Sequence, residues 1–183
     1  KYVQEFESKF ENYLNSNHCV AVNNGTSALH LALMAIGLKS GDEVLVPTFS
    51  FFATCESVSL TGAKPIFVDS DYINFNIDLN DLESKITKKT KAIVCVHLYG
   101  NPCDLESLSL LCKKYNLYLI EDAAQAHGAE FNNKKIGNFS DFACFSFYPT
   151  KNLGAYGEGG AVITNSKDNH KKLISLRNHA SLE

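Results

Sequence analysis

The hydrophobic and polar positions of this chain follow two alternating patterns. Residues 2–15 carry apolar side chains at the spacing of one helix face, which predicts an amphipathic helix. From residue 18 to about residue 121, short and continuously apolar runs alternate with segments of helical character. Continuous apolar runs are typical of parallel strands that are covered on both faces. The pattern therefore predicts an α/β fold with a mostly parallel central sheet.

The same reading assigns an element to each segment in turn. After residue 121 the alternation changes, and short strands follow without long helices between them. Strands are predicted at 18–22, 42–47, 64–69, 91–98, 117–122, 141–147 and 160–165. Further helices are predicted at 25–38, 51–62, 79–86 and 104–116, and in the segment that begins at residue 166.

Composition narrows the class of protein. The chain has 183 residues, of which 45% are hydrophobic, and its formal net charge is -3. This length suits one domain with one well-buried core. The lysine-rich stretch 85–91 is interpreted as a solvated loop, so no broad basic surface for nucleic acid or an acidic membrane is expected. No apolar run is long enough to span a bilayer and no signal peptide opens the chain, which favours the cytoplasm.

The cysteines and the chain ends add two expectations. Six cysteines are scattered without a Cys-x-x-Cys pair, which indicates buried and reduced thiols and no metal site. The sequence starts at Lys1 and stops within a helix-like segment. A piece of a longer protein is therefore expected.

Polar side chains gather where the predicted strands end. In open α/β sheets, ligands bind beyond the carboxyl ends of the strands, so these groups are the first candidates for a site. His97 and Tyr99, taken alone, are interpreted as structural. The other groups are a turn at 23–27 rich in amide and hydroxyl groups, the segment 48–51, the segment 121–125 and the segment 146–151.

The turn at 23–27 joins a predicted strand to a predicted helix. Its sequence, Asn-Asn-Gly-Thr-Ser, places free backbone N–H groups at a helix N-terminus, where a phosphate is held well. The alternative is that Thr26 or Ser27 simply caps the helix. Asp122, at the end of a buried strand, needs a partner, which is either an Arg, a Lys or a backbone N–H of the protein, or a cationic ring nitrogen of a cofactor. Gln125 follows three residues later and can reach the same pocket.

Lys151 lies between an aromatic strand and a cluster of glycines. Ser146 precedes it by five residues, and four of the eleven glycines of the chain fall between residues 154 and 160. A solvated loop lysine is one interpretation. A desolvated amine, which is a good nucleophile at neutral pH, is the other. A phosphate site, a carboxylate, an aromatic ring and a lysine together suit pyridoxal phosphate.

Three motifs then point to a known family. The segments NNGTSALHLAL, IEDAAQAHGA and FSFYPTKNLGAYGEGGAV, in this order, resemble the DegT/DnrJ/EryC1/StrS aminotransferases from about residue 2 to residue 180. The resemblance implies the three-layer large domain of the type I pyridoxal-phosphate transferases, with a mostly parallel central sheet. Residues 1–183 would form this cofactor-binding domain, with the N-terminal helix at 2–15. The C-terminal small domain would lie outside the sequence.

The resemblance also implies a role for each group at the strand ends. Lys151 would bond to the cofactor aldehyde and then carry a proton as general base and acid. Asp122 would pair with the pyridine nitrogen, and Gln125 would lie near the phenolic oxygen. The remaining cofactor contacts would be the phosphate-binding residues Gly25, Thr26, Ser27 and Ser146, and Phe51, which would stack on the ring.

The activity that the resemblance implies is transamination of a nucleotide-linked keto sugar, with glutamate as the amino donor. Lysine stands at 151, where a dehydrating branch of the family has histidine. The glycine-rich pattern after it favours a dTDP-3-keto-6-deoxyhexose as substrate. Amination of a 4-keto sugar or a keto-inositol stays open, as does a non-catalytic protein that binds the cofactor or a nucleotide sugar. A homodimer with a shared active site is expected.

Overall fold

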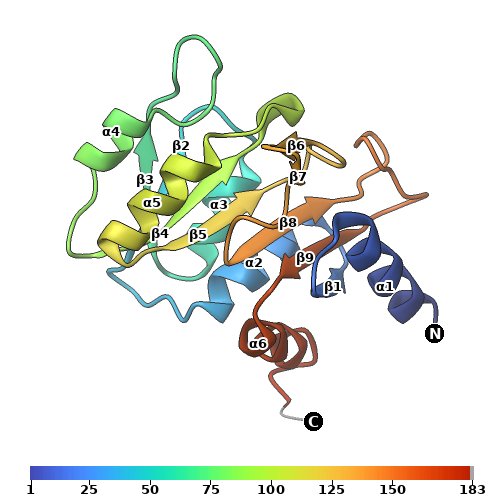
Figure 1. Cartoon of the computed structure of the whole chain (residues 1–183). Coiled ribbons are helices and arrows are strands. Elements are labelled where there is room, and N and C mark those ends of the chain that lie inside the picture. The colour runs from blue at the N-terminus through green and yellow to red at the C-terminus, as the bar shows by residue number, and fades with distance from the viewer. Residues whose placement is uncertain (182–183) are drawn as a thin grey trace.

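The computed structural model describes residues 1–181 and contains a sheet of seven strands between two layers of helices (Figure 1). The strand order is β1-β9-β8-β5-β4-β2-β3, which places β5 at the centre. The three-layer α/β arrangement predicted from the sequence is confirmed. The strands are β1 (His18–Val22), β2 (Glu43–Pro47), β3 (Lys64–Val68), β4 (Thr90–Val96), β5 (Tyr118–Asp122), β8 (Phe142–Ser146) and β9 (Gly160–Thr164).

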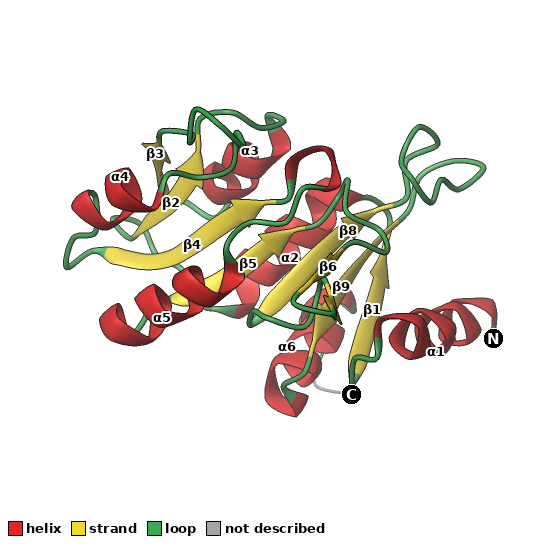
Figure 2. Ribbon diagram, turned by 45° about the horizontal axis from the view of Figure 1, so that its top comes forward, coloured by secondary structure: helices red, strands yellow, loops and turns green. Residues whose placement is uncertain are grey.

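The helices divide between the two faces of the sheet (Figure 2). Buried side chains of α1 (Tyr2–Leu14), α4 (Leu79–Ser84) and α5 (Leu105–Tyr115) belong to one hydrophobic cluster. Those of α2 (Gly25–Ala35), α3 (Ala53–Leu60) and α6 (Lys167–Arg177) belong to the other. A short 3₁₀ helix, η1 (Leu98–Gly100), follows β4. None of the helices among residues 1–181 has the length and apolar character needed to cross a membrane.

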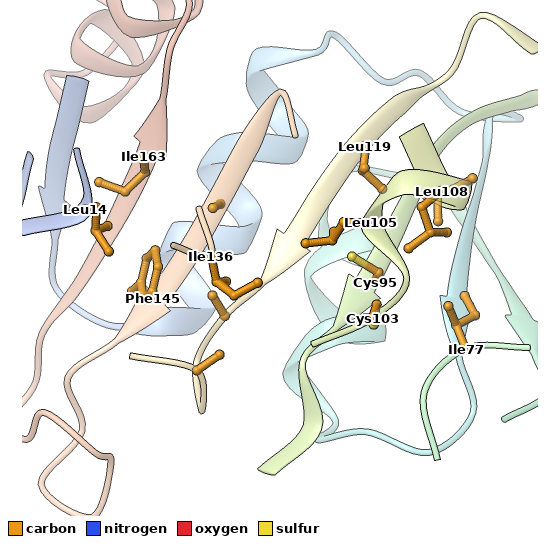
Figure 3. Packing of buried hydrophobic residues seen from close by; sticks show 14 of the residues in the cluster. Leu14, Ile77, Cys95, Cys103, Leu105, Leu108, Leu119, Ile136, Phe145 and Ile163 are labelled. Atoms are coloured by element: carbon orange, nitrogen blue, oxygen red, sulfur yellow. The ribbon is translucent and has the colours of Figure 1, made fainter. Parts of the chain in front are cut away.

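Successive residues of each central strand supply opposite clusters. In β8, Phe145 joins the cluster under α1 and α5, which Figure 3 shows, whereas Phe142 and Cys144 join the cluster under α2. The same alternation separates Ile93 from Val94 in β4. Because both faces of the sheet are covered, both sets of side chains are apolar, and this explains the continuous apolar runs in the sequence.

All strands of the sheet except β9 run in the same direction. β1 pairs antiparallel with β9, and β9 pairs antiparallel with β8, so β1 and β8 are parallel to each other. The pairs β8–β5, β5–β4, β4–β2 and β2–β3 are parallel. The carboxyl ends of β1, β2, β4, β5 and β8 therefore meet at one edge of the sheet.

Helix α1 closes the free edge of β1. Glu7 Oε1 accepts a hydrogen bond of 2.9 Å from the N–H of Ala21, and Glu11 Oε1 accepts one of 2.7 Å from the N–H of Cys19. These carboxylates take the place of a neighbouring strand, because an unpaired edge would otherwise expose its N–H groups. The contact also fixes the strand that leads into the 23–27 turn.

Neither η1 nor a short hairpin after β5 was predicted. Between β5 and β8 the chain forms a hairpin of β6 (Glu130–Phe131) and β7 (Lys134–Lys135). Its turn residues Asn132 and Asn133 have φ values of 48° and 60°, as a two-residue hairpin turn requires. Strands of two residues are too short to show a hydrophobic period, and the Asn-Asn pair was the available signal.

Candidate active site

A cavity of about 440 Å³ lies at the carboxyl edge of the sheet. It brings together seven of the eight residues predicted for the site. The eighth, Ser27, faces a neighbouring groove that is lined by α2 and Arg177. The seven predicted residues that line the cavity are Gly25, Thr26, Phe51, Asp122, Gln125, Ser146 and Lys151.

The turn between β1 and α2 forms one wall of the cavity. Asn24 is the N-cap of α2, and its side-chain Oδ1 accepts a hydrogen bond of 2.8 Å from the N–H of Ser27. The cap is therefore Asn24, rather than the Thr26 or Ser27 that the sequence suggested. The helix begins at Gly25, so its first N–H groups and its dipole favour an anion at this wall.

Gly25 allows β8 to approach this turn closely. A Cβ atom at residue 25 would lie 2.7 Å from Cβ of Ser146 and 3.1 Å from its Oγ. Ser146 is buried, and its Oγ accepts a hydrogen bond of 3.4 Å from the N–H of Tyr148. The hydroxyl of Ser146 and the start of α2 thus form a cradle that a larger residue at position 25 would fill. Its donors suit a phosphate.

Asp122 ends the central strand β5 and is buried. Its Oδ2 accepts a hydrogen bond of 2.8 Å from Thr54 Oγ1, and its Oδ1 accepts one of 3.2 Å from the N–H of Ala124. Burial raises the pKa of Asp122 above its ordinary value, and these hydrogen bonds oppose that shift. A cationic group in the cavity would stabilise the ionised carboxylate.

A hydroxyl group behind Asp122, that of Thr54, was missed in the sequence, whereas Ser50 lies in the candidate segment 48–51. Thr54 Oγ1 lies 2.9 Å from Ser50 Oγ, and Ser50 lines the cavity. The single O–H of Thr54 donates its hydrogen bond to the carboxylate. The hydroxyl of Ser50 must therefore donate to Thr54 Oγ1, and both hydrogen bonds point toward Asp122. The available signal was a pair of hydroxyl residues, four positions apart, just after a predicted strand.

Glu121 and His97 do not reach the cavity. They lie on the opposite face of the sheet and are fully buried, with His97 Nε2 3.1 Å from Glu121 Oε2. His97 Nδ1 accepts a hydrogen bond of 3.1 Å from the N–H of Cys103, so the ring is the tautomer that donates from Nε2. Burial tends to raise the pKa of Glu121, but hydrogen bonds from His97 and other donors hold it below its usual range.

Five of the six cysteines are buried, as the sequence indicated, and Cys55 is only half-buried. The buried side chains of Cys95, His97 and Cys103 bring three potential metal-ligand atoms within 4.8 Å of one another. Both ring nitrogens of His97 already face protein groups, and Cys103 Sγ donates to the carbonyl of Val96 at 3.2 Å. A metal ion would have to displace these contacts.

Lys151 projects from a loop whose base is closed by backbone hydrogen bonds. The N–H of Phe147 donates to the carbonyl of Gly159 at 2.7 Å, and the N–H of Ala155 donates to the carbonyl of Phe147 at 2.8 Å. Lys151 itself donates from its N–H to the carbonyl of Tyr148 at 2.8 Å. The loop is thereby tied to β8 on one side and to the start of β9 on the other.

The glycines beside Lys151 permit close backbone approaches. A Cβ atom at Gly160 would collide with the carbonyl of Asn24, and one at Gly154 would collide with the carbonyl of Pro149. The close approach at Gly160 packs the start of β9 against the turn that forms the cradle. The close approach at Gly154 allows the loop to fold back on itself. Lys151 is half-buried, and its charge acts to lower the pKa of Asp122.

The family described as the DegT/DnrJ/EryC1/StrS aminotransferase family matches residues 1–183. A curated relative from Aneurinibacillus thermoaerophilus, dTDP-3-amino-3,6-dideoxy-alpha-D-galactopyranose transaminase, is 49% identical over 179 residues, which are 98% of this chain and 49% of the relative. Other relatives are named for GDP- or UDP-linked sugars. The chain spans about half the length of the curated relatives it matches.

Solved structures share the fold. The structure of S. venezuelae DesV in complex with a ketimine intermediate matches with a TM-score of 0.97 and 43% identity, over 100% of this chain and 49% of DesV. The E. coli GDP-4-keto-6-deoxy-D-mannose-3-dehydratase with bound hydrated PLP matches with a TM-score of 0.92 and 32% identity, over 98% of this chain and 47% of that protein.

Proposed function

The chain belongs to the DegT/DnrJ/EryC1/StrS aminotransferase family, and we propose that the full-length protein is a pyridoxal-phosphate-dependent aminotransferase of a nucleotide-linked keto sugar. The observation that carries this proposal is the single cavity shared by Asp122, Gln125, Ser146 and Lys151. It offers a carboxylate, an amide, a hydroxyl and an amine at one edge of the sheet.

The residues present fit the cofactor. The cradle formed by Gly25, Thr26 and Ser146 supplies hydroxyl and N–H donors for a phosphate. The buried carboxylate of Asp122 suits a protonated ring nitrogen, and Lys151 offers a primary amine for an aldehyde. When bound, pyridoxal phosphate supplies an electron-accepting ring that stabilises negative charge on a substrate carbon.

Asp122 has the task of keeping the ring nitrogen protonated. Its carboxylate is buried and is oriented by Thr54 and by the N–H of Ala124. Because an opposite charge nearby favours ionisation, a cationic nitrogen in the cavity lowers the pKa of Asp122 from its raised value. The carboxylate and the nitrogen then stabilise each other.

Lys151 has two tasks. Its Nζ would hold the cofactor through the aldehyde carbon. Once the amino donor has replaced it there, Nζ would move a proton from the donor α-carbon to that carbon of the cofactor, as general base and then as general acid. The closed base of the lysine loop supports this role, because it holds the side chain at the cavity through both steps. Glutamate is the proposed donor.

The rest of the protein completes the site. Phe51 lines the cavity but is 73% exposed, and its neighbours Phe49 and Phe52 are exposed as well. We assign Phe51 to stacking on the cofactor ring.

Residues 1–183 act as the large, cofactor-binding domain, and a small domain together with a second copy of the chain covers the open side of the cavity. Ser27 lines the neighbouring groove rather than this cavity.

The substrate is a dTDP-linked 3-keto-6-deoxyhexose. The glycine-rich segment 154–160 beside Lys151 supports this choice, as does the name of the dTDP-sugar relative. Glu158 of that segment lines the cavity and can accept hydrogen bonds from a sugar. A 4-keto sugar and a keto-inositol are the alternatives within the same reaction class.

The test uses the full-length protein. Pyridoxal phosphate is added, borohydride is used to fix it, and the modified peptide is identified by mass spectrometry. Labelling at Lys151, together with loss of turnover in Lys151→Ala, supports the proposal. A protein that gains no visible absorbance with pyridoxal phosphate contradicts it. Reaction with glutamate, followed by a screen of keto sugars for return of the original absorbance, identifies the substrate.

A further inference from the structure

Tyr99, in η1 after β4, has a left-handed backbone conformation with φ 55° and ψ 22°. Half of the described non-glycine residues with positive φ are asparagines, which tolerate this region. A tyrosine does so at an energetic cost, and such residues persist where the surrounding structure holds them. Tyr99 lies beside the cavity, and a specific contact is expected to hold its backbone in this conformation.

The reason is a hydrogen bond to Gln125. The N–H of Tyr99 donates to Gln125 Oε1 at 2.6 Å. The next residue, Gly100, has φ 80°, and a Cβ atom there would lie 3.1 Å from the carbonyl oxygen of Gln125. The N–H of His97 donates to the carbonyl of Asp122 at 3.1 Å. Two of these approaches hold η1 against Gln125, and the third holds the residue before η1 against the end of β5.

The hydrogen bond sets the orientation of the Gln125 amide. Only the oxygen of the amide can accept a hydrogen bond from a backbone N–H, so Nε2 is the atom left for other partners. Gln125 lines the cavity. We propose that the left-handed backbone of Tyr99 is a positioning device, which presents Gln125 Nε2 as a hydrogen-bond donor to the ring oxygen of bound pyridoxal phosphate. This proposal rests on the proposed function.

A donor at that oxygen has a measurable effect. A hydrogen bond to an ionised oxygen favours the ionised form, so Gln125 lowers the pH at which the bound cofactor changes its visible absorption. The side chain of Tyr99 has no part in this effect, because its ring is 79% exposed and the contact comes from the backbone.

The first test replaces the donor. The variant Gln125→Glu keeps one oxygen that can accept the hydrogen bond from the N–H of Tyr99. At neutral pH the second carboxylate oxygen carries no proton, so the variant has no donor for the cofactor oxygen. We expect the pH midpoint of the absorption change, measured on the full-length protein loaded with pyridoxal phosphate, to rise by about one unit, and cofactor binding to weaken about tenfold. An unchanged midpoint in Q125E overturns the proposal.

The second test changes the backbone of residue 99. Tyr99→Gly keeps the N–H and adopts positive φ without strain, so the midpoint stays at the wild-type value. Tyr99→Val carries a β-branched side chain that resists this conformation, so it shifts the midpoint upward. If Y99V binds the cofactor with an unchanged midpoint, the orientation of Gln125 does not depend on residue 99.

Phe75 provides a matched control. It also has positive φ, 61°, but its N–H donates to the carbonyl of Asp71. Phe75→Val is expected to lower thermal stability and to leave the midpoint unchanged; a shift equal to that of Y99V overturns the proposal. A wild-type protein without any visible band overturns the proposed function, and this inference with it. A normal wild-type band with an unshifted Q125E overturns the inference alone.

Discussion

Thr54 Oγ1 donates a hydrogen bond of 2.8 Å to Oδ2 of Asp122, although the two residues are 68 positions apart in the chain. Both side chains are buried, with 2% of Thr54 and 6% of Asp122 exposed. The contact joins the first turn of α3 to the end of the central strand. Together with the N–H of Ala124, it holds the carboxylate in one orientation at the cavity.

Replacing Thr54 with valine keeps the volume of the side chain and removes the donor. We expect the free energy of unfolding to fall by about 1–3 kcal/mol, because a buried acceptor loses its partner. The pKa of Asp122 should rise further, and cofactor binding should lose strength as pH falls. Urea unfolding and cofactor titration between pH 5 and pH 8 measure both effects. Thr54→Ser keeps the hydroxyl, so a loss of binding in T54S equal to that in T54V would show that the hydroxyl is not responsible.

Gly25→Ala tests the cradle. The new Cβ atom would lie 2.7 Å from Cβ of Ser146, so either α2 or β8 must shift. We expect stability to fall by about 1–3 kcal/mol and the affinity for pyridoxal phosphate to fall at least tenfold. Gly157→Ala is the control, because no atom lies within 4 Å of a Cβ at that position. Similar affinities in the two variants would mean that the approach of Ser146 does not matter.

Glu121 is expected to control how the free energy of unfolding changes at acidic pH. It accepts hydrogen bonds from His97 Nε2, Ser140 Oγ and the N–H groups of Gly137 and Phe139. Its pKa is lowered in the folded protein, so its contribution is complete above the unfolded pKa of about 4.3 and is lost as pH falls through the folded pKa.

Glu121→Gln is therefore expected to lower the unfolding free energy by about 3 kcal/mol at neutral pH, with a smaller difference from wild type below pH 4. The comparison with wild type isolates Glu121 from Asp122, whose raised pKa makes the folded state less stable as pH rises. Urea denaturation at a series of pH values gives the answer, and a pH-independent difference would refute the assignment.

The edge of β1 provides a fourth prediction. Glu7 accepts from the N–H of Ala21 and also pairs with Arg177 at 2.6 Å, so one carboxylate joins α1, β1 and α6. Glu7→Ala should speed amide exchange at Ala21 and destabilise the fold by about 1–2 kcal/mol. Glu5→Ala removes only the exposed pair with Lys9 and should change neither quantity. Unchanged exchange at Ala21 in E7A would argue against an edge role.

The sequence located the site because apolar strands end in polar groups there. Asp122 and Lys151 stand just after such runs, and parallel strands bring their ends to one edge of the sheet. The choice of Asp122 over Glu121 came from the family resemblance. Adjacent residues of a strand point to opposite faces, and both faces of this sheet are buried, so polarity alone does not tell which carboxylate enters the cavity.

Other features depend on contacts between distant segments. The partnership of Thr54 with Asp122 crosses from a helix to a strand, and the left-handed backbone of Tyr99 depends on Gln125, 26 positions away. No local pattern carries such information.

The position of β1 has a consequence for the order in which the protein matures. β1 is the second element of the chain, but within the described residues its only strand partner is β9, more than 130 residues later. A growing chain can therefore assemble β2, β3, β4 and β5 well before β1 gains its neighbour, and closing so long a loop is slow. The cofactor cradle, which needs both Gly25 and the start of β9, is thus expected to be among the last parts of the domain to form, so that cofactor capture follows folding of the rest of the sheet.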